Sequence, residues 1–309
     1  MNIDKAAMHE AAMHEVLTPK ISIAILDTGI APVRDLISPT NRILASIDFV
    51  NKLSHAYDDN GHGTHVAAIA AGNGLMSNGV HRGVAPQAGV VSVKVLDEEG
   101  RGNATDALAG IQWIIDNKNL YNIKVANLSI GTMDVGVADP LVKAVEAAWD
   151  AGIVMVIAAG NNGPKKQSIT SPGTSRKVIT VGASDDQNPV DIAGNAMKNF
   201  SGRGPTLDCI VKPDILAPGC GIISCLSNSP ELCPTRVAKM NLVGGHYVRM
   251  SGTSMASPQI AGACALLLLK YPKLSPNDVK LRLKNTAINL QFSPNRQGWG
   301  LLDIDGLLG

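Results

Sequence analysis

The sequence has few aromatic residues, no excess of either charge and no long apolar run. Phe, Trp and Tyr make up 3% of its 309 residues, which disfavours the stacking platforms that bind single-stranded nucleic acid. Lys and Arg number 27 against 26 Asp and Glu, and a net charge of +1 gives no basic footprint for nucleic acid or an anionic membrane. No stretch reaches 18 apolar residues, so we expect no membrane span. Neither nucleic acid nor a membrane is therefore an expected partner.

Cysteine is scarce and irregularly spaced. Four of the five cysteines lie between residues 209 and 233, yet none belongs to a C-x-x-C pair, so a zinc site is not expected. Free thiols in a reducing compartment are the favoured interpretation. One disulfide among Cys220, Cys225 and Cys233 is the alternative.

A secretory signal is not visible in the sequence. The chain begins at Met1 without a basic segment followed by an apolar one. We therefore expect a cytoplasmic protein, or a secreted one if a signal and a prodomain are removed ahead of residue 1.

Apolar residues are abundant, at 45% of the chain, and 31 glycines allow close backbone approach. Short apolar runs rich in β-branched residues predict buried parallel strands over residues 21–26, 90–96, 125–130, 153–158 and 178–181. Helical spacing predicts helices over residues 66–71, 105–117 and 140–151, with Thr105 as a cap, and a further helix capped by Ser275. This alternation predicts an α/β fold with a doubly wound, mainly parallel sheet and helices on both faces. We expect a single domain over residues 21–309, preceded by an N-terminal arm over residues 1–20.

Polar residues follow two of these strands, at the carboxyl ends where such a sheet gathers its chemistry. Asp27 comes directly after the first strand and precedes a glycine turn, and Asn161 follows the strand over residues 153–158. Either residue could simply stabilise a turn. Asn161 could also donate a side-chain hydrogen bond to a developing oxyanion.

His62 lies in the segment DDNGHGTH, between two glycines and immediately before an apolar helix. Metal binding is one interpretation, because His65 follows three residues later and His81 further along. Zinc hydrolases of the H-E-x-x-H type carry a glutamate between the histidines, however, and here Gly63 and Thr64 take that place. The favoured interpretation makes His65 a packed neighbour.

Ser254 lies in the segment SGTSMASP, at the head of an apolar helix that runs to about Lys270. A serine in this place could be only a helix cap. Its neighbours are small and leave the hydroxyl uncovered, and we expect Pro258 in the first helical turn, where its missing N–H costs little. The helix N-terminus would add unpaired N–H groups and positive potential that stabilise an oxyanion.

Asp27, His62 and Ser254 occur in one of the chain orders known for an Asp-His-Ser triad, with Asn161 between the last two. The chain resembles the subtilisin-like serine proteases (subtilases) through AILDTGI, NGHGTHVAAI, AAGNNG and SGTSMASP, which contain these four residues in turn. The resemblance extends from about residue 21 to residue 303. FSGRGP at 200–205 and VKPDILAPG at 211–219 are most similar to the intracellular AprX-type branch.

The resemblance implies a serine endopeptidase of broad specificity that acts on extended or unfolded polypeptides through an acyl-enzyme. Ser254 would be the nucleophile, His62 the general base and Asp27 the residue that fixes the tautomer of His62. The side chain of Asn161 and the backbone N–H of Ser254 would hold the oxyanion.

The resemblance also implies two strand-like edges for the substrate and a primary specificity pocket. The implied binding residues are Gly100, Arg101 and Gly102 on one edge, Leu128, Ser129, Ile130 and Gly131 on the other, and Ala158, Ala159, Gly160 and Thr170 beside the pocket. The pocket residues are small and largely uncharged, which favours apolar or medium-sized substrate side chains. The acidic run at residues 97–99 would favour a basic residue further along the substrate, or is a solvated turn.

Two features depart from the secreted members of this family. Only about 20 residues precede the first strand, where secreted members carry a signal and a prodomain, so maturation stays open. The loop over residues 72–80, where secreted members bind calcium, lacks a carboxylate. We expect no metal in catalysis and no tight calcium site in that loop, with a weak structural Ca²⁺ near Asp185 and Asp186 as the alternative.

Two other functions stay open at this stage. A catalytically silent scaffold or pseudoprotease would keep the fold without turnover, although it would not need to retain the triad and Asn161. Zinc hydrolysis is the third possibility, and insensitivity to a chelator would exclude it.

Overall fold

Runs of apolar residues that are buried on both faces pair into one parallel sheet. The computed structural model describes residues 19–132, 139–186, 199–229, 232 and 241–309. Within these residues the sheet consists of β1 (Ser22–Asp27), β2 (Ile43–Asp48), β3 (Gly89–Lys94), β4 (Ile123–Leu128), β5 (Val154–Ala158), β6 (Ile179–Ala183) and β7 (Ile215–Ala217). Neighbouring strands are parallel throughout. The predicted doubly wound α/β fold is confirmed.

The strand order is β2-β3-β1-β4-β5-β6-β7, so β2 lies at one edge, β3 returns between β2 and β1, and β4 to β7 follow in chain order on the other side of β1. Leu26 of β1 pairs with Val93 of β3 and with Leu128 of β4. Because these three strands are parallel, the loops that follow them leave the sheet on the same side, at the carboxyl ends of the strands. A doubly wound sheet binds its ligands at this kind of switch point.

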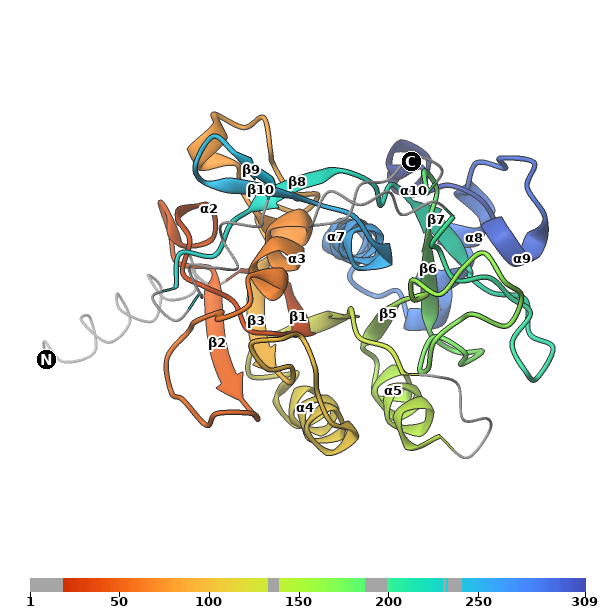
Figure 1. Cartoon of the computed structure of the whole chain (residues 1–309), viewed down its shortest axis with the longest axis horizontal. Helices are drawn as coiled ribbons and strands as arrows, with labels where there is room; N and C mark the ends of the chain where they lie inside the picture. Colours follow the sequence, from red (N-terminus) through yellow and green to blue (C-terminus); the bar gives the residue numbers. More distant parts are fainter. Residues whose placement is uncertain (1–18, 133–138, 187–198, 230–231, 233–240) are drawn as a thin grey trace, which may run out of the picture.

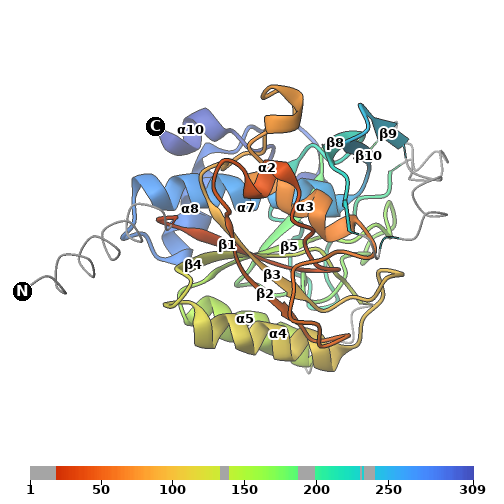
Figure 2. The ribbon, with the colours of Figure 1, turned by 90° about the vertical axis from the view of Figure 1, so that its left-hand side faces the viewer.

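Helices cover both faces of the sheet (Figures 1 and 2). The helices α3 (His62–Ala71) and α7 (Thr253–Lys270) pack together on one face, and α4 (Ala104–Asn117) and α5 (Pro140–Asp150) pack together on the other. The helix α7 contacts β4, β5 and β6 and is buried around most of its circumference, as expected for a helix without a polar face. No helix among the described residues is both long and apolar enough to cross a membrane.

Smaller elements surround this framework. A second, antiparallel sheet consists of β8 (Ile222–Cys225), β9 (Asn241–Val243) and β10 (Tyr247–Met250). The remaining helical segments are α2 (Arg34–Ile37), η1 (Leu75–Ser77), α8 (Pro276–Thr286), α9 (Pro294–Gln297) and α10 (Ile304–Leu308).

Three predictions about helix starts are corrected by the structure. The helix predicted over residues 66–71 begins four residues earlier, so His62 is the first residue of α3. The cap of α4 is Asn103, whose side chain accepts the backbone N–H of Asp106 at 2.8 Å, so Thr105 already lies inside the helix. Pro258 lies in the interior of α7, beyond the first turn, where it cannot donate to the carbonyl of Ser254. The predicted cap of α8 is confirmed, because Ser275 and Asp278 form a capping box.

The described cysteines do not form disulfides. Cys209, Cys220, Cys225 and Cys264 are free thiols in the structure. A disulfide that uses Cys220 or Cys225 is therefore not formed, whereas Cys233 lies outside the described residues, as does most of the expected N-terminal arm.

Candidate active site

Asp27, the last residue of β1, and His62, the first residue of α3, form the centre of the site. The Nδ1 atom of His62 donates to Oδ1 of Asp27 at 2.7 Å, and the backbone N–H of Thr28 donates to the same oxygen at 2.8 Å. The Asp27 side chain is fully buried, whereas that of His62 is 23% exposed. A buried carboxylate that accepts from Nδ1 leaves Nε2 of the neutral ring as the acceptor atom, which is the tautomer that a general base requires.

The glycines around His62 allow α3 to begin against the turn that follows Asp27. A Cβ atom on Gly63 would lie 2.1 Å from the carbonyl oxygen of Gly29 and 3.2 Å from Cβ of Asp27. Gly61, the residue before the helix, has φ +95°, a conformation that favours glycine. The local pattern G-H-G is therefore required by close packing of two backbone segments.

A buried carboxylate that the sequence analysis did not single out organises the loop before His62. Asp58 accepts hydrogen bonds from the hydroxyl of Thr28, the backbone N–H of Gly61 and both the N–H and the hydroxyl of Thr64, at 2.6 to 2.9 Å. Its position four residues before the histidine, in an unusually polar segment, is the signal that could have identified it.

Ser254 occupies the first turn of α7, across the switch point from His62. Its hydroxyl is half-buried and lies 3.4 Å from the carbonyl oxygen of Ser129, which follows β4. The preceding cap residue, Gly252, has φ +153° and is held by a backbone hydrogen bond to Gly219. The N-terminal N–H groups and the positive end of the dipole of α7 are thereby placed beside the hydroxyl.

Asn161 is fixed by the same helix terminus. Its Oδ1 atom accepts from the backbone N–H of Thr253 at 2.9 Å and from the Thr253 hydroxyl at 3.0 Å. Because the amide oxygen is engaged, the amide nitrogen faces the other way, and it lies 3.4 Å from where a Cβ on Gly252 would be. The side chain is thus oriented as a hydrogen-bond donor next to Ser254.

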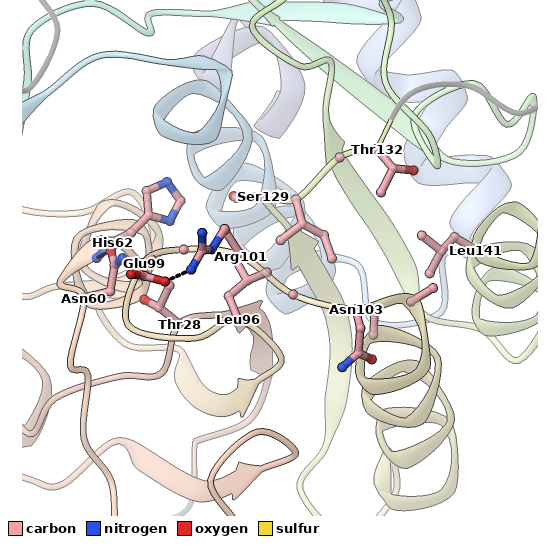
Figure 3. Close-up of a pocket in the computed structure, with 16 residues that line it drawn as sticks. Thr28, Asn60, His62, Leu96, Glu99, Arg101, Asn103, Ser129, Thr132 and Leu141 are labelled. Carbon is pink, nitrogen blue, oxygen red and sulfur yellow. Dashed lines mark hydrogen bonds and ion pairs between the residues drawn. The ribbon is translucent and has the colours of Figure 1, made fainter.

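Two adjoining cavities meet at the segment after β4. The larger, of about 510 Å³, is lined by Thr28, Asn60, His62, Leu96, Glu99, Gly100, Arg101, Gly102, Asn103, Ala104, Ala107, Ser129, Ile130, Gly131, Thr132 and Leu141. The smaller, of about 240 Å³, is lined by Ser129, Ile130, Gly131, Ala158, Gly160, Asn161, Asn162, Thr170, Thr253 and Ser254. Ser129, Ile130 and Gly131 belong to both. Figure 3 shows His62 at one side of the larger cavity and Leu141 at the opposite side.

Two predicted binding residues do not line either cavity. Leu128 and Ala159 have fully buried side chains. Leu128 is the last residue of β4 and packs in the hydrophobic core. Successive side chains of an extended segment point in opposite directions, so the residues next to them face the cavities instead. The other nine predicted binding residues line one cavity or both.

The acidic run at residues 97–99 forms a turn with internal pairing. Asp97 accepts the backbone N–H groups of Glu99 and Arg101, at 3.0 and 2.8 Å. The guanidinium of Arg101 forms an ion pair with Glu99 at the rim of the larger cavity (Figure 3). Arg101 offsets part of the negative charge of this run, and the preference for a basic substrate residue stays a prediction.

His65 lies away from the cavities, in the core between α3 and the small sheet. Its Nε2 atom donates to the carbonyls of Ile222 and Val248 at 3.2 and 3.1 Å, so that atom carries a proton and cannot bind a metal. Burial lowers the pKa of His65 from its ordinary 6.5 to about 3. Nowhere in the described ranges do three or more His, Cys, Asp or Glu side chains cluster as metal ligands would.

The carboxylate nearest the loop over residues 72–80 already accepts protein donors. Asp35, the carboxylate beside the loop over residues 72–80, accepts from the Met76 N–H at 2.9 Å, the Tyr247 hydroxyl at 2.8 Å and the Cys225 thiol at 3.4 Å. Both carboxylate oxygens of Asp35 are thus engaged by protein donors, and the absence of a tight calcium site in this loop stays a prediction.

The alternative calcium position is also occupied by protein groups. Asp185 accepts the backbone N–H groups of Gly219 and Cys220, at 2.7 and 3.1 Å. Asp186 lies within 3.7 Å of Arg203 and 3.6 Å of Arg296, so two cations of the chain already face it. Oδ1 of Asp186 is nevertheless buried without a hydrogen-bond partner, so a weak structural Ca²⁺ at this position stays a prediction.

Comparison with protein families decides where the chain belongs. The model of the subtilase family matches residues 18–300. The chain belongs to the subtilase family. This subtilase is 46% identical over 301 residues to the serine protease AprX of Bacillus subtilis (strain 168), over 94% of this chain and about two thirds (67%) of that protein. It is 34% identical to subtilisin DY of Bacillus licheniformis, over 92% of this chain and 89% of that protein.

Solved structures of proteases share the fold of this subtilase. A chain titled S41 psychrophilic protease superposes with a TM-score of 0.71 at 32% identity, over 91% of this chain and 90% of that one. A cold adapted subtilisin-like serine proteinase superposes with a TM-score of 0.68 at 28% identity, over 91% and 87%. The expected family resemblance is confirmed, and the relatives indicate a serine-type endopeptidase.

Proposed function

We propose that this subtilase cleaves extended polypeptides through an acyl-enzyme, with Ser254 as nucleophile, His62 as general base and Asp27 as the residue that orients His62. The hydrogen bond of 2.7 Å between Asp27 and His62, at the mouth of a cavity that continues to Ser254, is the observation that carries the proposal. His62 takes the proton of the Ser254 hydroxyl as the hydroxyl attacks the carbonyl carbon, and returns it to the leaving amine. Water then attacks the ester in the same way and frees Ser254.

Two donors from residues that line the smaller cavity would stabilise the oxyanion. One is the amide nitrogen of Asn161, which is oriented because its oxygen accepts from Thr253. The other is the backbone N–H of Ser254 in the first turn of α7, where N–H groups have no helical partner. Preorganised donors of this kind stabilise the transition state more than the ground state.

The substrate binds as an added strand between two edges of this chain. Gly100, Arg101 and Gly102 line one side of the larger cavity, and Ser129, Ile130 and Gly131 line the other. Backbone pairing on both sides requires an extended peptide, which unfolded polypeptides supply more readily than folded ones. The apolar residues Leu96, Ile130 and Leu141 in the larger cavity favour an apolar side chain upstream of the cleaved bond.

The smaller cavity accepts the side chain that precedes the cleaved bond. None of its lining residues carries a formal charge, so it has no group to select Lys, Arg, Asp or Glu. Thr170 limits its depth, because the side chain of Thr170 contacts Gly131 and Gly160 so closely that a Cβ on either glycine would lie within 2.7 Å of it. Apolar side chains of small or medium size fit this space best.

The proposed reaction needs no metal ion, because a triad with an oxyanion hole supplies its own base and its own positive potential. It also suits a reducing compartment, since the described cysteines are free thiols. We therefore place the protein in the cytoplasm, which fractionation of the source cells would test.

Hydrolysis of a chromogenic peptide with an apolar residue before the scissile bond tests the proposal. The wild type and Ser254→Ala are compared with and without a serine-directed phosphonate, and the adduct is located by mass spectrometry. We expect turnover in the wild type only, lost on stoichiometric labelling of Ser254. A folded wild type that neither turns over nor becomes labelled would contradict the mechanism and favour a silent scaffold.

A further inference from the structure

Lys94, the last residue of β3, is one of two lysines among the described residues whose side chains are almost completely buried. Its ammonium donates to the carbonyl oxygens of Thr28 and Leu96, both at 2.8 Å, and to Oδ1 of Asp59 at 2.7 Å. A lysine ammonium has three N–H bonds, and all three have acceptors here.

The three acceptors belong to three different parts of the active site. Thr28 follows Asp27 directly, and Asp59 precedes His62 by three residues. Leu96 lines the larger cavity just before the substrate edge at residues 100–102. One cation therefore connects the loop after β1, the loop before α3 and the loop after β3.

Short hydrogen bonds continue from these acceptors to the reacting groups. The backbone N–H of Thr28 donates to Oδ1 of Asp27, and the hydroxyl of Thr28 accepts the N–H of Gly63 at 2.9 Å. Asn60, the residue after Asp59, accepts the backbone N–H of His62 at 3.2 Å and donates to the carbonyl of Glu98 at 2.9 Å. A shift of the ammonium would thus displace both members of the Asp27–His62 pair.

Stability alone is a weak reason for a charge in this position. Well-packed apolar residues often replace a buried ion pair at no cost in stability, because desolvation offsets the attraction between the charges. An apolar side chain could not join three oxygen atoms from separate loops, whereas an ammonium has three donors that can do so.

We propose that Lys94 is a positioning residue that holds Asp27, His62 and the substrate edge in register through its three hydrogen bonds. This inference rests on the proposed function and adds a residue to it. Lys94 does not touch the substrate, so its effect acts through the geometry of the groups that do.

The chain contains a matched control for this proposal. Lys212 is the other fully buried lysine in the part of the chain that the structure describes. Its ammonium donates to Asp214 at 2.5 Å, to the Thr180 hydroxyl at 2.9 Å and to the Val178 carbonyl at 3.2 Å. It has the same chemistry and burial as Lys94 but joins β6 and the segment before β7 rather than the loops of the site.

The experiment compares neutral replacements of the two ion pairs. Lys94→Met with Asp59→Asn, and Lys212→Met with Asp214→Asn, each remove both charges of one buried pair. In the second variant Lys280, which lies 3.5 Å from Asp214, loses that carboxylate but keeps the carbonyls of Arg176, Lys177 and Val178 as acceptors. Asp59→Asn alone serves as the milder variant should the first pair of substitutions not fold. Thermal unfolding is followed for each protein, and kcat, KM and the rate of phosphonate labelling of Ser254 are measured below all unfolding transitions.

We expect the Lys94 pair of substitutions to lower kcat and the labelling rate at least tenfold, because small displacements of reacting groups have large effects on rate. Asp59→Asn should lower both rates by a smaller factor, and the Lys212 pair should keep both within twofold of the wild type. The inference is wrong if the folded Lys94 variants keep both rates within twofold, or if the Lys212 pair loses as much. An inactive and unlabelled wild type would instead contradict the proposed function itself, and this inference with it.

Discussion

The carboxylate of Asp27 and the imidazole of His62 lie 2.7 Å apart, although 35 positions separate them in the chain. Asp27 ends β1 and His62 begins α3, and these two elements meet at the switch point of the sheet although α2 and β2 lie between them in the chain. The contact fixes which nitrogen of His62 carries the proton, because a carboxylate can only accept.

Asp27→Asn should therefore lower kcat on the order of 10⁴-fold while KM changes little, as in other triad proteases, since asparagine can hold the wrong tautomer of the ring. Steady-state hydrolysis of the chromogenic peptide provides the measurement. Asp116→Asn, an exposed position on α4, is the control and should behave as the wild type. A loss below tenfold in Asp27→Asn would show that His62 does not depend on this carboxylate.

Asn161 allows donation and positioning to be separated in a second prediction. Asn161→Asp keeps an oxygen that can accept from Thr253, but replaces the amide donor with an acceptor. If the amide nitrogen stabilises the oxyanion, both Asn161→Asp and Asn161→Ala should lower kcat by about 10²–10³-fold, a magnitude that comes from a subtilisin. Near-normal turnover in Asn161→Asp would mean that Asn161 only positions Thr253.

Sequence patterns predicted the strands whose residues are almost all apolar and buried. The strands β1, β3, β4, β5 and β6 are almost entirely buried, so their apolar runs identified them within two residues at each end. The edge strand β2 is only partly buried, and β7 has three residues, so neither produced a comparable run. The small sheet of β8, β9 and β10 was missed because its strands have only three or four residues each.

Tertiary contacts explain the remaining differences in the site. The motifs marked segments of chain, and they could not tell that Leu128 and Ala159 face the interior while their neighbours face the cavities. Lys94 reads as an ordinary lysine in the run VVSVKVL, because its partners Thr28 and Asp59 are distant in sequence. The contacts of Lys94 exist only in the folded chain, where the loops that carry Thr28, Asp59 and Leu96 surround its ammonium.

Thr170 leads to a third prediction, on specificity. Thr170→Ala removes the hydroxyl and the methyl group that face Gly131 and Gly160, which deepens the smaller cavity. We expect kcat/KM for a peptide with Phe before the scissile bond to rise at least threefold relative to one with Ala. Thr174→Ala, four residues along the same loop and outside both cavities, should leave the ratio unchanged. An unchanged ratio in Thr170→Ala would place the specificity pocket elsewhere.

Chelation provides a fourth prediction. Asp35 and Asp185, which lie at the two calcium positions considered above, already accept protein donors, and the proposed chemistry uses no metal. Prolonged dialysis against a strong chelator should leave kcat/KM unchanged and shift the thermal unfolding midpoint by less than about 2 °C, far below the shift expected when a tightly bound ion is lost. A loss of activity that zinc or calcium restores would contradict the metal-free mechanism.

The buried neutral His65 leads to a fifth prediction, on the pH dependence of stability. Its pKa is about 3 in the folded chain and close to 6.5 in the unfolded chain, so between these values only the unfolded state binds the proton. The free energy of unfolding should therefore fall as pH decreases from 6.5 towards 3, by up to about 1.4 kcal/mol per pH unit from this residue. Chemical denaturation in a Ser254→Ala background, where self-cleavage is blocked, measures how the free energy of unfolding changes with pH.

His65→Gln is the variant that tests this prediction. Glutamine keeps a donor for the carbonyls of Ile222 and Val248 but does not titrate, so the variant should have a lower free energy of unfolding at pH 7.5 and a weaker dependence of that energy on pH. An unflattened pH dependence in His65→Gln would assign the acid sensitivity to other groups.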